Sequence, residues 1–250
     1  MNQFEIVAHR GIATQYPENT IPAFQKAIEL GADAVEFDVR LTKDKVPVVY
    51  HYYYLDKLTT LKGPIFDYKY EDLIQAEFLW ALNEFDALKI PMLEDVLEVI
   101  GGKIGLEIEI KGPEPESTLI IGEVLRKFKN LWGTIEVTSY ETSLLLNIRE
   151  QCPGIATALL YPHSESWMNL DVVAYQSANL GRLAGVRAVH LHPNQLSSEV
   201  VNYVRRSGVE IHAWDVNNEQ AIRKVVEYNI PKICTDHFEW AADYRSRILV

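Results

Sequence analysis

Two short stretches of the sequence carry a carboxylate at every second position. Residues 34–40 read AVEFDVR and place Glu36 and Asp38 on one face of an expected strand, and residues 105–111 read GLEIEIK and place Glu109 in the same way. Carboxylate oxygens are the ligands that Mg²⁺ and Ca²⁺ prefer in proteins. Three like charges in one pocket repel unless a cation neutralises them. We therefore expect Glu36, Asp38 and Glu109 to bind one divalent cation, Mg²⁺ or Ca²⁺.

The same alternation also has a plainer explanation. A sheet with one solvated face shows polar side chains at every second position without any site. For any one of the three carboxylates the two explanations are equally good. The three together favour a site, since the strands of a closed barrel are buried on both faces and buried carboxylates need partners.

Four side chains at the ends of expected strands could act on a phosphate ester. Arg10 and Lys111 carry only hydrogen-bond donors, which suits them to bind phosphate oxygens, although both could also form ion pairs with the carboxylates. His9 and His51 titrate close to neutral pH and could serve as general acid and base. A single histidine at a strand end is more often structural, but two that flank an acidic cluster favour catalysis.

Further aromatic and imidazole side chains give weaker signals. Trp214 ends an expected strand and could form the wall of a pocket for a small polyol, or simply pack in the core. His190, His192 and His212 also fall in or beside expected strands. We expect no carboxylate beside these three histidines and assign them no role.

The candidate residues would meet if the chain forms a closed parallel barrel. Eight apolar or alternating runs predict strands, and a run with helical periodicity follows each of them. The expected strands are residues 5–8, 34–40, 105–111, 134–138, 156–160, 188–191, 210–216 and 232–235. Eight βα units predict an α/β fold, a (β/α)₈ TIM barrel, with its active site at the carboxyl ends of the strands. A doubly wound open sheet is the alternative, but the Gly-x-Gly-x-x-Gly turn typical of it is missing.

Helices and one insertion complete the predicted organisation. The expected helices are residues 21–30, 92–100, 115–130, 142–150, 167–180, 197–207, 219–228 and 240–248. Asn19 or Thr20 is placed to cap the first of them. An extra strand over 46–50 precedes an irregular insertion at about 52–90, which contains a short helix over 70–79. We expect residues 1–250 to form a single domain that includes this insertion.

Bulk composition narrows the classes of partner. Among the 250 residues, 48% are apolar, which is enough for a core, and the net charge of −11 argues against nucleic acid as a partner. No apolar run approaches the ~18 residues that span a bilayer, so we expect no stable membrane insertion. The first strand begins within five residues of the N-terminus, which leaves no room for a signal peptide and predicts a cytoplasmic protein. Cys152 and Cys234 are expected to be reduced thiols.

The chain resembles the glycerophosphodiester phosphodiesterase family, in particular its cytosolic bacterial members. The resemblance rests on these motifs: His9-Arg10-Gly11, Pro17-Glu18-Asn19-Thr20, Glu36-x-Asp38-Val39, Val48-Val49-x-His51, Ile108-Glu109-Ile110-Lys111, Trp214-x-Val216-Asn217 and Thr235-Asp236. It implies a TIM barrel with a small insertion after the second strand. It also implies a divalent cation on Glu36, Asp38 and Glu109, with His9 and His51 as acid and base. The implied reaction is hydrolysis of a small-molecule glycerophosphodiester to sn-glycerol 3-phosphate and an alcohol such as choline or ethanolamine.

Two positions depart from the family pattern. Tyr52 stands where the family usually has Asp, and Glu107 stands where Asn is common. Glu107 shares a strand face with Glu109 but lies two residues deeper, about 7 Å along the strand. We expect Glu107 to pair with a cation such as Arg40 or Lys111, the alternative being that it adds to the charge around the metal.

Two other functions stay open at this point. A tyrosine-rich insertion would suit acyl chains, which would make the chain a lysophospholipase D-like or phosphoinositide-type enzyme of the same fold. The divergent sequence around His51 would also suit a barrel that binds phosphodiesters with weakened catalysis.

Overall fold

Eight parallel strands close into a barrel in the computed structural model, which describes residues 4–80 and 88–248. The strands are β1 (Glu5–His9), β2 (Ala34–Leu41), β4 (Gly105–Ile110), β5 (Ile135–Ser139), β6 (Ala156–Leu160), β7 (Ala188–Leu191), β8 (Glu210–Ala213) and β9 (Lys232–Thr235). They pair in the order β1-β9-β8-β7-β6-β5-β4-β2, and the pairing of β1 with β2 closes the ring. The expected (β/α)₈ barrel is thus confirmed, and the open doubly wound sheet is excluded.

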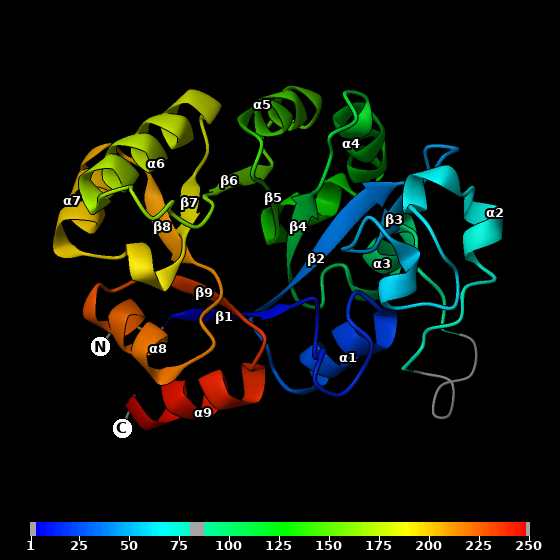
Figure 1. Cartoon of the computed structure of the whole chain (residues 1–250), viewed down its shortest axis with the longest axis horizontal. Helices are drawn as coiled ribbons and strands as arrows, with labels where there is room; N and C mark the ends of the chain where they lie inside the picture. The colour runs from blue at the N-terminus through cyan, green and yellow to red at the C-terminus, as the bar shows by residue number, and fades with distance from the viewer. Residues whose placement is uncertain (1–3, 81–87, 249–250) are drawn as a thin grey trace.

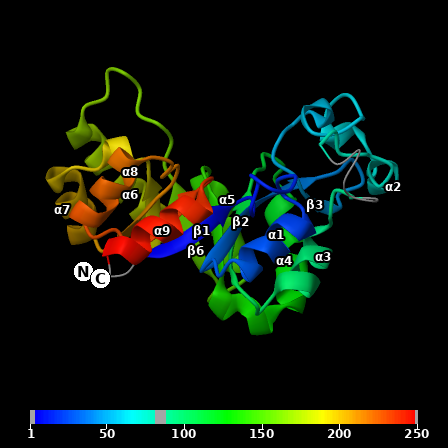
Figure 2. The same cartoon turned by 90° about the horizontal axis from the view of Figure 1, so that it is seen from below.

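Helices surround the barrel, and apolar side chains fill the layer between them and the strands (Figure 1). They are α1 (Ile21–Glu29), α3 (Leu93–Ile100), α4 (Ser117–Lys127), α5 (Thr142–Gln151), α6 (Leu170–Ala184), α7 (Ser198–Arg206), α8 (Glu219–Glu227) and α9 (Phe238–Ile248). Two short 3₁₀ helices, η3 (Lys129–Thr134) and η4 (Pro193–Gln195), lie in the connections. Helix α9 lies against β1, where the Arg245 guanidinium donates a hydrogen bond to the Phe4 carbonyl at 3.0 Å (Figure 2).

The segment between β2 and α3 forms a lobe beside the barrel, as both views show (Figures 1 and 2). It comprises β3 (Pro47–Val49), which pairs antiparallel with β2, and the short helices η1 (Leu55–Lys57), η2 (Ile65–Asp67) and α2 (Tyr70–Leu73). A separate apolar cluster that includes Tyr50, Leu55 and Phe78 holds the lobe together. The expected insertion is therefore present, although its residues 81–87 lie outside the described part of the chain.

Several expected elements have different ends in the structure, among them the helix expected over 115–130, which ends at residue 127 and is followed by η3. The helix expected over 70–79 is wrong beyond residue 73, because Phe78 instead forms an antiparallel bridge with Thr59. Strand β8 ends at residue 213 rather than 216, since Asp215 adopts a left-handed conformation with φ +58°.

Helix α6 extends to residue 184, four residues beyond its expected end. Gly181, the residue after the expected end, lies within α6 and faces the barrel. A Cβ at this position would lie 2.9 Å from the Val189 Cγ1 atom. The glycine therefore lets helix and strand pack closely, and Gly185, with φ +61°, ends the helix instead.

The turn after β1 is built from residues with left-handed backbone. Arg10, Gly11 and Asn19 all have positive φ, and a Cβ on Gly11 would lie 2.7 Å from the Ala23 carbonyl carbon. Thr20 occupies the N-cap position of α1, but its hydroxyl donates to the Pro17 carbonyl and does not cap the helix. The expectation of a side-chain cap from Asn19 or Thr20 is wrong, because Asn19 has another partner in the barrel.

Within the described residues, no helix is long and apolar enough to cross a membrane. Both cysteines are buried and free.

Candidate active site

The carboxyl ends of β2 and β4 bring three carboxylates together. Asp38 lies opposite Glu109 in the pairing of these strands, and Glu36 lies two residues before Asp38 on the same face. One ligand oxygen from each of the three lies within 4.8 Å of the others, and the residues are 6%, 0% and 7% exposed for Glu36, Asp38 and Glu109. A solvated sheet face is therefore excluded, and the cluster could hold a metal ion.

Asn19 fixes the orientation of the most buried of these carboxylates. Its side-chain amide donates to Asp38 Oδ2 at 2.9 Å, and its carbonyl oxygen accepts from the Asp38 backbone N–H at 3.1 Å. The left-handed turn after β1 thus positions a ligand candidate on the neighbouring strand. Asn19 was expected at a helix end, and nothing in the local sequence indicates this contact.

Two cations lie beside the carboxylates. Lys111 Nζ is 3.0 Å from Asp38 Oδ1 and 2.8 Å from Glu109 Oε1. Arg10 Nε is 3.3 Å from Asp38 Oδ2, while Arg10 NH1 donates to Glu18 Oε1 at 2.9 Å. Both therefore form the ion pairs that the sequence allowed, and both lie where they could also contact an anion bound near the cluster.

The three carboxyl groups have unequal charge states. Burial, and then the negative charge of Asp38, raise the pKa of both Glu36 and Glu109. Burial also acts to raise the pKa of Asp38, but Lys111 and Arg10 outweigh it and hold that pKa well below its ordinary value. Ionising Glu36 and Glu109 therefore costs free energy in this structure, and an additional positive charge among the three would favour it. Asp38 Oδ1, moreover, is buried and accepts no hydrogen bond among the described residues.

His9 sits between two acidic groups at the end of β1. Its Nδ1 is 2.6 Å from Asp236 Oδ1, and its Nε2 is 3.7 Å from Glu36 Oε2. Burial acts to lower the pKa of His9, but the hydrogen bond to Asp236 and the charge of Glu36 outweigh it, so the pKa is raised. Asn217 in turn donates to Asp236 Oδ2 at 2.6 Å. The structure therefore favours a protonated His9.

His51 has the opposite electrostatic environment. Burial, together with the positive charges of Lys111 and Arg10, lowers the pKa of His51 to about 3, although Asp38 acts to raise it. Its Nδ1 is buried without a hydrogen-bond partner among the described residues. The ring of Tyr52, the residue that replaces the usual Asp, packs edge-on against the His51 ring at 4.7 Å between centroids. His51 is therefore a neutral imidazole with a free ring nitrogen.

Trp214 follows β8 and belongs to an aromatic group on the same end of the barrel. Its indole N–H donates to the Tyr161 carbonyl at 3.2 Å, and its ring contacts His163 and His192 at centroid distances of 4.7 and 5.4 Å. Tyr140 packs edge-on against it at 6.5 Å. The indole is half-buried, so part of the ring packs against these aromatic neighbours and the rest is accessible from outside.

A family model described as "Glycerophosphoryl diester phosphodiesterase family" matches residues 9–239. The chain belongs to this family. A glycerophosphodiester phosphodiesterase of Caldanaerobacter subterraneus subsp. tengcongensis is 31% identical over 243 residues, covering 92% of this chain and 93% of that protein.

Solved structures agree with this membership. A glycerophosphodiester phosphodiesterase from Thermotoga maritima superposes with a TM-score of 0.73 at 27% identity, covering 98% of this chain and 99% of that one. An Oleispira antarctica phosphodiesterase solved in complex with the product sn-glycerol-3-phosphate superposes with a TM-score of 0.83 at 24% identity, covering 96% of both chains. The likeness to the Oleispira antarctica protein, at 24% identity, shows that the two chains share a fold.

Other polar groups inside this member of the family lie away from the candidate site. Glu107 pairs with Lys232, whose Nζ is 2.7 Å from Glu107 Oε1. The expectation that Glu107 pairs with a cation is thus confirmed, but the expected cations, Arg40 and Lys111, are wrong. Arg40 and Lys111 belong to the same two strands as the carboxylate cluster, whereas barrel closure brings Lys232, at the start of β9, to Glu107.

The expectation for the internal histidines is also wrong. His190 Nε2 and His212 Nδ1 each lie 3.6 Å from Glu136 Oε2. His192 Nε2 lies 3.5 Å from Asp215 Oδ2. The sequence places no carboxylate next to these histidines, because the neighbouring strands that supply it are far away along the chain.

Proposed function

We propose that this chain hydrolyses glycerophosphodiesters to sn-glycerol 3-phosphate and an alcohol. The observation that carries the proposal is the buried set of Glu36, Asp38 and Glu109, flanked by His9 and His51, in a chain of this family. The relatives named as glycerophosphodiester phosphodiesterases, and the neighbour solved with sn-glycerol-3-phosphate, support the substrate class. We propose further that residues 1–250 act as one catalytic domain and work in the cytoplasm, where two free cysteines are ordinary.

Glu36, Asp38 and Glu109 would hold one divalent cation. Their donor atoms are all oxygen, which suits Mg²⁺ or Ca²⁺ better than a softer metal. When bound, such an ion supplies charge stabilisation at a phosphoryl oxygen. Arg10 and Lys111 would share that role, since each keeps donors aimed at the same region and phosphoryl transfer builds charge on those oxygens.

His9 and His51 would divide the proton transfers. His9, held protonated by Asp236, is suited to give a proton to the leaving alcohol oxygen. His51, neutral and with an unpaired ring nitrogen, is suited to accept a proton from the attacking oxygen. Trp214 would form one wall for the glycerol moiety, as its half-buried ring lies beside Tyr140 on this end of the barrel.

One observation favours a second substrate class, lysophospholipids. The insertion lobe exposes Tyr53, Tyr54, Phe66 and Trp80, which are 46%, 56%, 45% and 51% exposed. A cavity of about 180 Å³ lies between this lobe and the β1 turn, and its lining includes Pro17, Phe78 and Glu18, the ion-pair partner of Arg10. An acyl chain could lie there while its head group reaches the carboxylates.

Release of sn-glycerol 3-phosphate from glycerophosphocholine, with and without a chelator, tests the proposal. We expect turnover that stops with chelator and returns with Mg²⁺ or Ca²⁺. Lysophosphatidylcholine in a parallel reaction identifies the second class if it is cleaved faster. Binding of both compounds without any product would instead indicate a barrel with weakened catalysis.

A further inference from the structure

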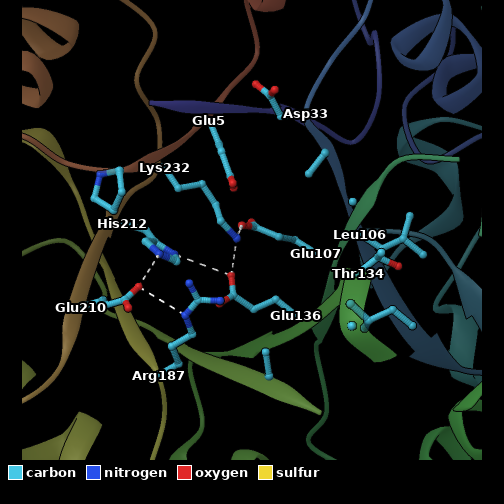
Figure 3. Close-up of a pocket in the computed structure, with 16 residues that line it drawn as sticks. Glu5, Asp33, Leu106, Glu107, Thr134, Glu136, Arg187, Glu210, His212 and Lys232 are labelled. Carbon is cyan, nitrogen blue, oxygen red and sulfur yellow. Dashed lines mark hydrogen bonds and ion pairs between the residues drawn. The ribbon is translucent and has the colours of Figure 1, made fainter. Parts of the chain in front are cut away.

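A second polar cavity opens at the opposite end of the barrel from the candidate active site. It has a volume of about 410 Å³ and lies among the first residues of the strands, including Glu5 of β1, Glu107 of β4 and Lys232 of β9. Figure 3 shows Lys232 and His212 pointing towards Glu136, and Glu107 pointing towards Lys232. Nothing in the proposed reaction uses these groups.

Three potential ligand atoms from three strands lie close together here. Glu136 and His212 line the cavity, and His190 of β7 contacts both of them from behind its wall. His212 Nδ1 is 3.0 Å from His190 Nε2, and each of these nitrogens is 3.6 Å from Glu136 Oε2. A triangle with these edges has its corners about 2.0 Å from its centre, which matches the 2.0–2.2 Å bonds that zinc forms with histidine and carboxylate ligands. One ion at the centre would therefore reach all three atoms without moving the backbone. Binding it would release the proton that the two ring nitrogens share in their hydrogen bond.

Glu136 has unused capacity to bind a cation. It is 5% exposed, and its Oε1 is buried without a hydrogen-bond partner among the described residues. Glu136 thus has a buried oxygen without a hydrogen bond, a costly arrangement in a protein interior.

A second carboxylate lies near the other ring nitrogen of one of the histidines. Glu210 Oε2 lies 3.7 Å from His212 Nε2, on the far side of the ring from Glu136. Metal-binding histidines commonly direct their other ring N–H towards a carboxylate, which fixes the tautomer and frees the ligating nitrogen. Here that arrangement would place the proton on Nε2 and leave Nδ1 facing the triangle.

Lys232 is the counter-ion already present. Its Nζ lies 2.6 Å from Glu136 Oε2 and 2.7 Å from Glu107 Oε1, so it neutralises part of the acidic charge. The oxygen that faces the two histidines is the one that Lys232 already contacts. A carboxylate offers about four lone-pair sites, so this oxygen can keep its contact with Lys232 while it binds an ion. Glu107 keeps Lys232 in place on the other side.

We propose that Glu136, His190 and His212 form a binding site for a transition-metal ion of the Zn²⁺ class, separate from the candidate active site. Two imidazoles and one carboxylate select Zn²⁺ or Co²⁺, whereas the oxygen-only set at the other end selects Mg²⁺ or Ca²⁺. The ion would tie β5, β7 and β8 together and raise the thermal stability of the barrel. Water in the open cavity could complete its coordination.

Zinc titration of the chelator-treated full-length chain tests this proposal. An excess of Mg²⁺ is present throughout, so that the oxygen-only site does not compete. Calorimetry should show one Zn²⁺ per chain, and the melting temperature should rise on zinc addition. His190→Gln and His212→Gln should lose most of the zinc affinity, and Glu210→Gln should lose about 10–100-fold. Each variant should keep the Mg²⁺-dependent activity, which arises at the other end.

His163→Gln is the matched control, because His163, His192 and Asp215 form another histidine–carboxylate group at the opposite end. It should leave zinc binding unchanged. X-ray absorption of the zinc-loaded wild-type chain should show two imidazole ligands, which keeps the proposal testable if a buried histidine variant does not fold. Absence of zinc binding, affinity unchanged in the His190, His212 and Glu210 variants, or a coordination shell without imidazole would each overturn it.

Discussion

The hydrogen bond between His9 and Asp236 gives the sharpest prediction about the candidate active site. Asp236→Asn removes the anion next to His9 but preserves the size of the side chain. Without that anion, burial lowers the pKa of His9, and less of the imidazole is protonated at neutral pH. If His9 gives a proton to the leaving group, the variant should react more slowly while its fold stays intact.

The size of the effect follows from the exposure of Asp236. A hydrogen bond to a charged group contributes about 1.5–3 kcal/mol. The Asp236 side chain is 45% exposed, so solvent screening places this contact at the lower end, about 1.5 kcal/mol. Since about 1.4 kcal/mol corresponds to a factor of ten in rate, we expect kcat/KM to fall about 10-fold. Stability should fall by no more than about 1.5 kcal/mol, which is what this contact contributes.

The assay is the pH dependence of kcat/KM for glycerophosphocholine at a fixed, saturating Mg²⁺ concentration. A raised His9 pKa means that the acid is active at low pH and is lost as the pH rises through that value. In Asp236→Asn the alkaline limb should therefore move to lower pH. Asp243→Asn, the same change at an exposed position of α9, serves as the control. An unmoved alkaline limb together with wild-type kcat/KM would refute the role assigned to His9 and Asp236.

Three further perturbations separate catalytic, structural and positioning roles. His9→Ala or His51→Ala should each reduce kcat about 10²–10⁴-fold with a much smaller change in KM, and near wild-type turnover in either variant would contradict the acid–base assignment. Glu107→Gln should lower the melting temperature, because it breaks a buried ion pair with Lys232. It should leave unchanged the Mg²⁺ concentration that gives half-maximal activity. A shift in that concentration would mean that Glu107 adds to the charge around the metal. Asn19→Ala should raise the Mg²⁺ concentration needed for half-maximal activity, since Asp38 loses both hydrogen bonds with the Asn19 side chain. An unchanged metal requirement would show that Lys111 and Arg10 position Asp38 without Asn19.

Sequence patterns were sufficient to predict the barrel and the meeting of its catalytic candidates. Strands β2 and β4 alternate so clearly that the shared face of Glu36, Asp38 and Glu109 could be read directly. Once eight βα units were counted, closure of the barrel made β2 and β4 neighbours. Register then placed Asp38 opposite Glu109, because both lie at the same position of parallel strands.

Contacts that depend on closure over long sequence distances could not be predicted. Asp236 meets His9 across 227 positions, and Lys232 meets Glu107 across 125. Asp236 was part of the family motif at the end of the last strand, which is the one signal that could have identified it. No comparable signal pointed to Glu136, which only the packing of side chains inside the barrel brings to His190 and His212.

Local breaks in regular structure also escaped prediction, for physical reasons that differ between positions. The helix expected to end at residue 180 continues through Gly181, where close packing on Val189 makes glycine the residue that fits. Asp215 reads as part of a strand, but its left-handed backbone ends β8 just after Trp214. In both cases tertiary packing overrides the local propensity of the chain.

The most direct test of the central claim is phosphorus NMR of glycerophosphocholine incubated with the purified chain and Mg²⁺ or Ca²⁺. Wild-type protein should convert the diester signal into that of sn-glycerol 3-phosphate. Asp38→Asn, which removes the firmly ionised carboxylate of the three, should not do so at any concentration of either ion, although circular dichroism shows it folded. Product formation by a folded Asp38→Asn variant at the wild-type rate would contradict the assignment of the metal and of the active site.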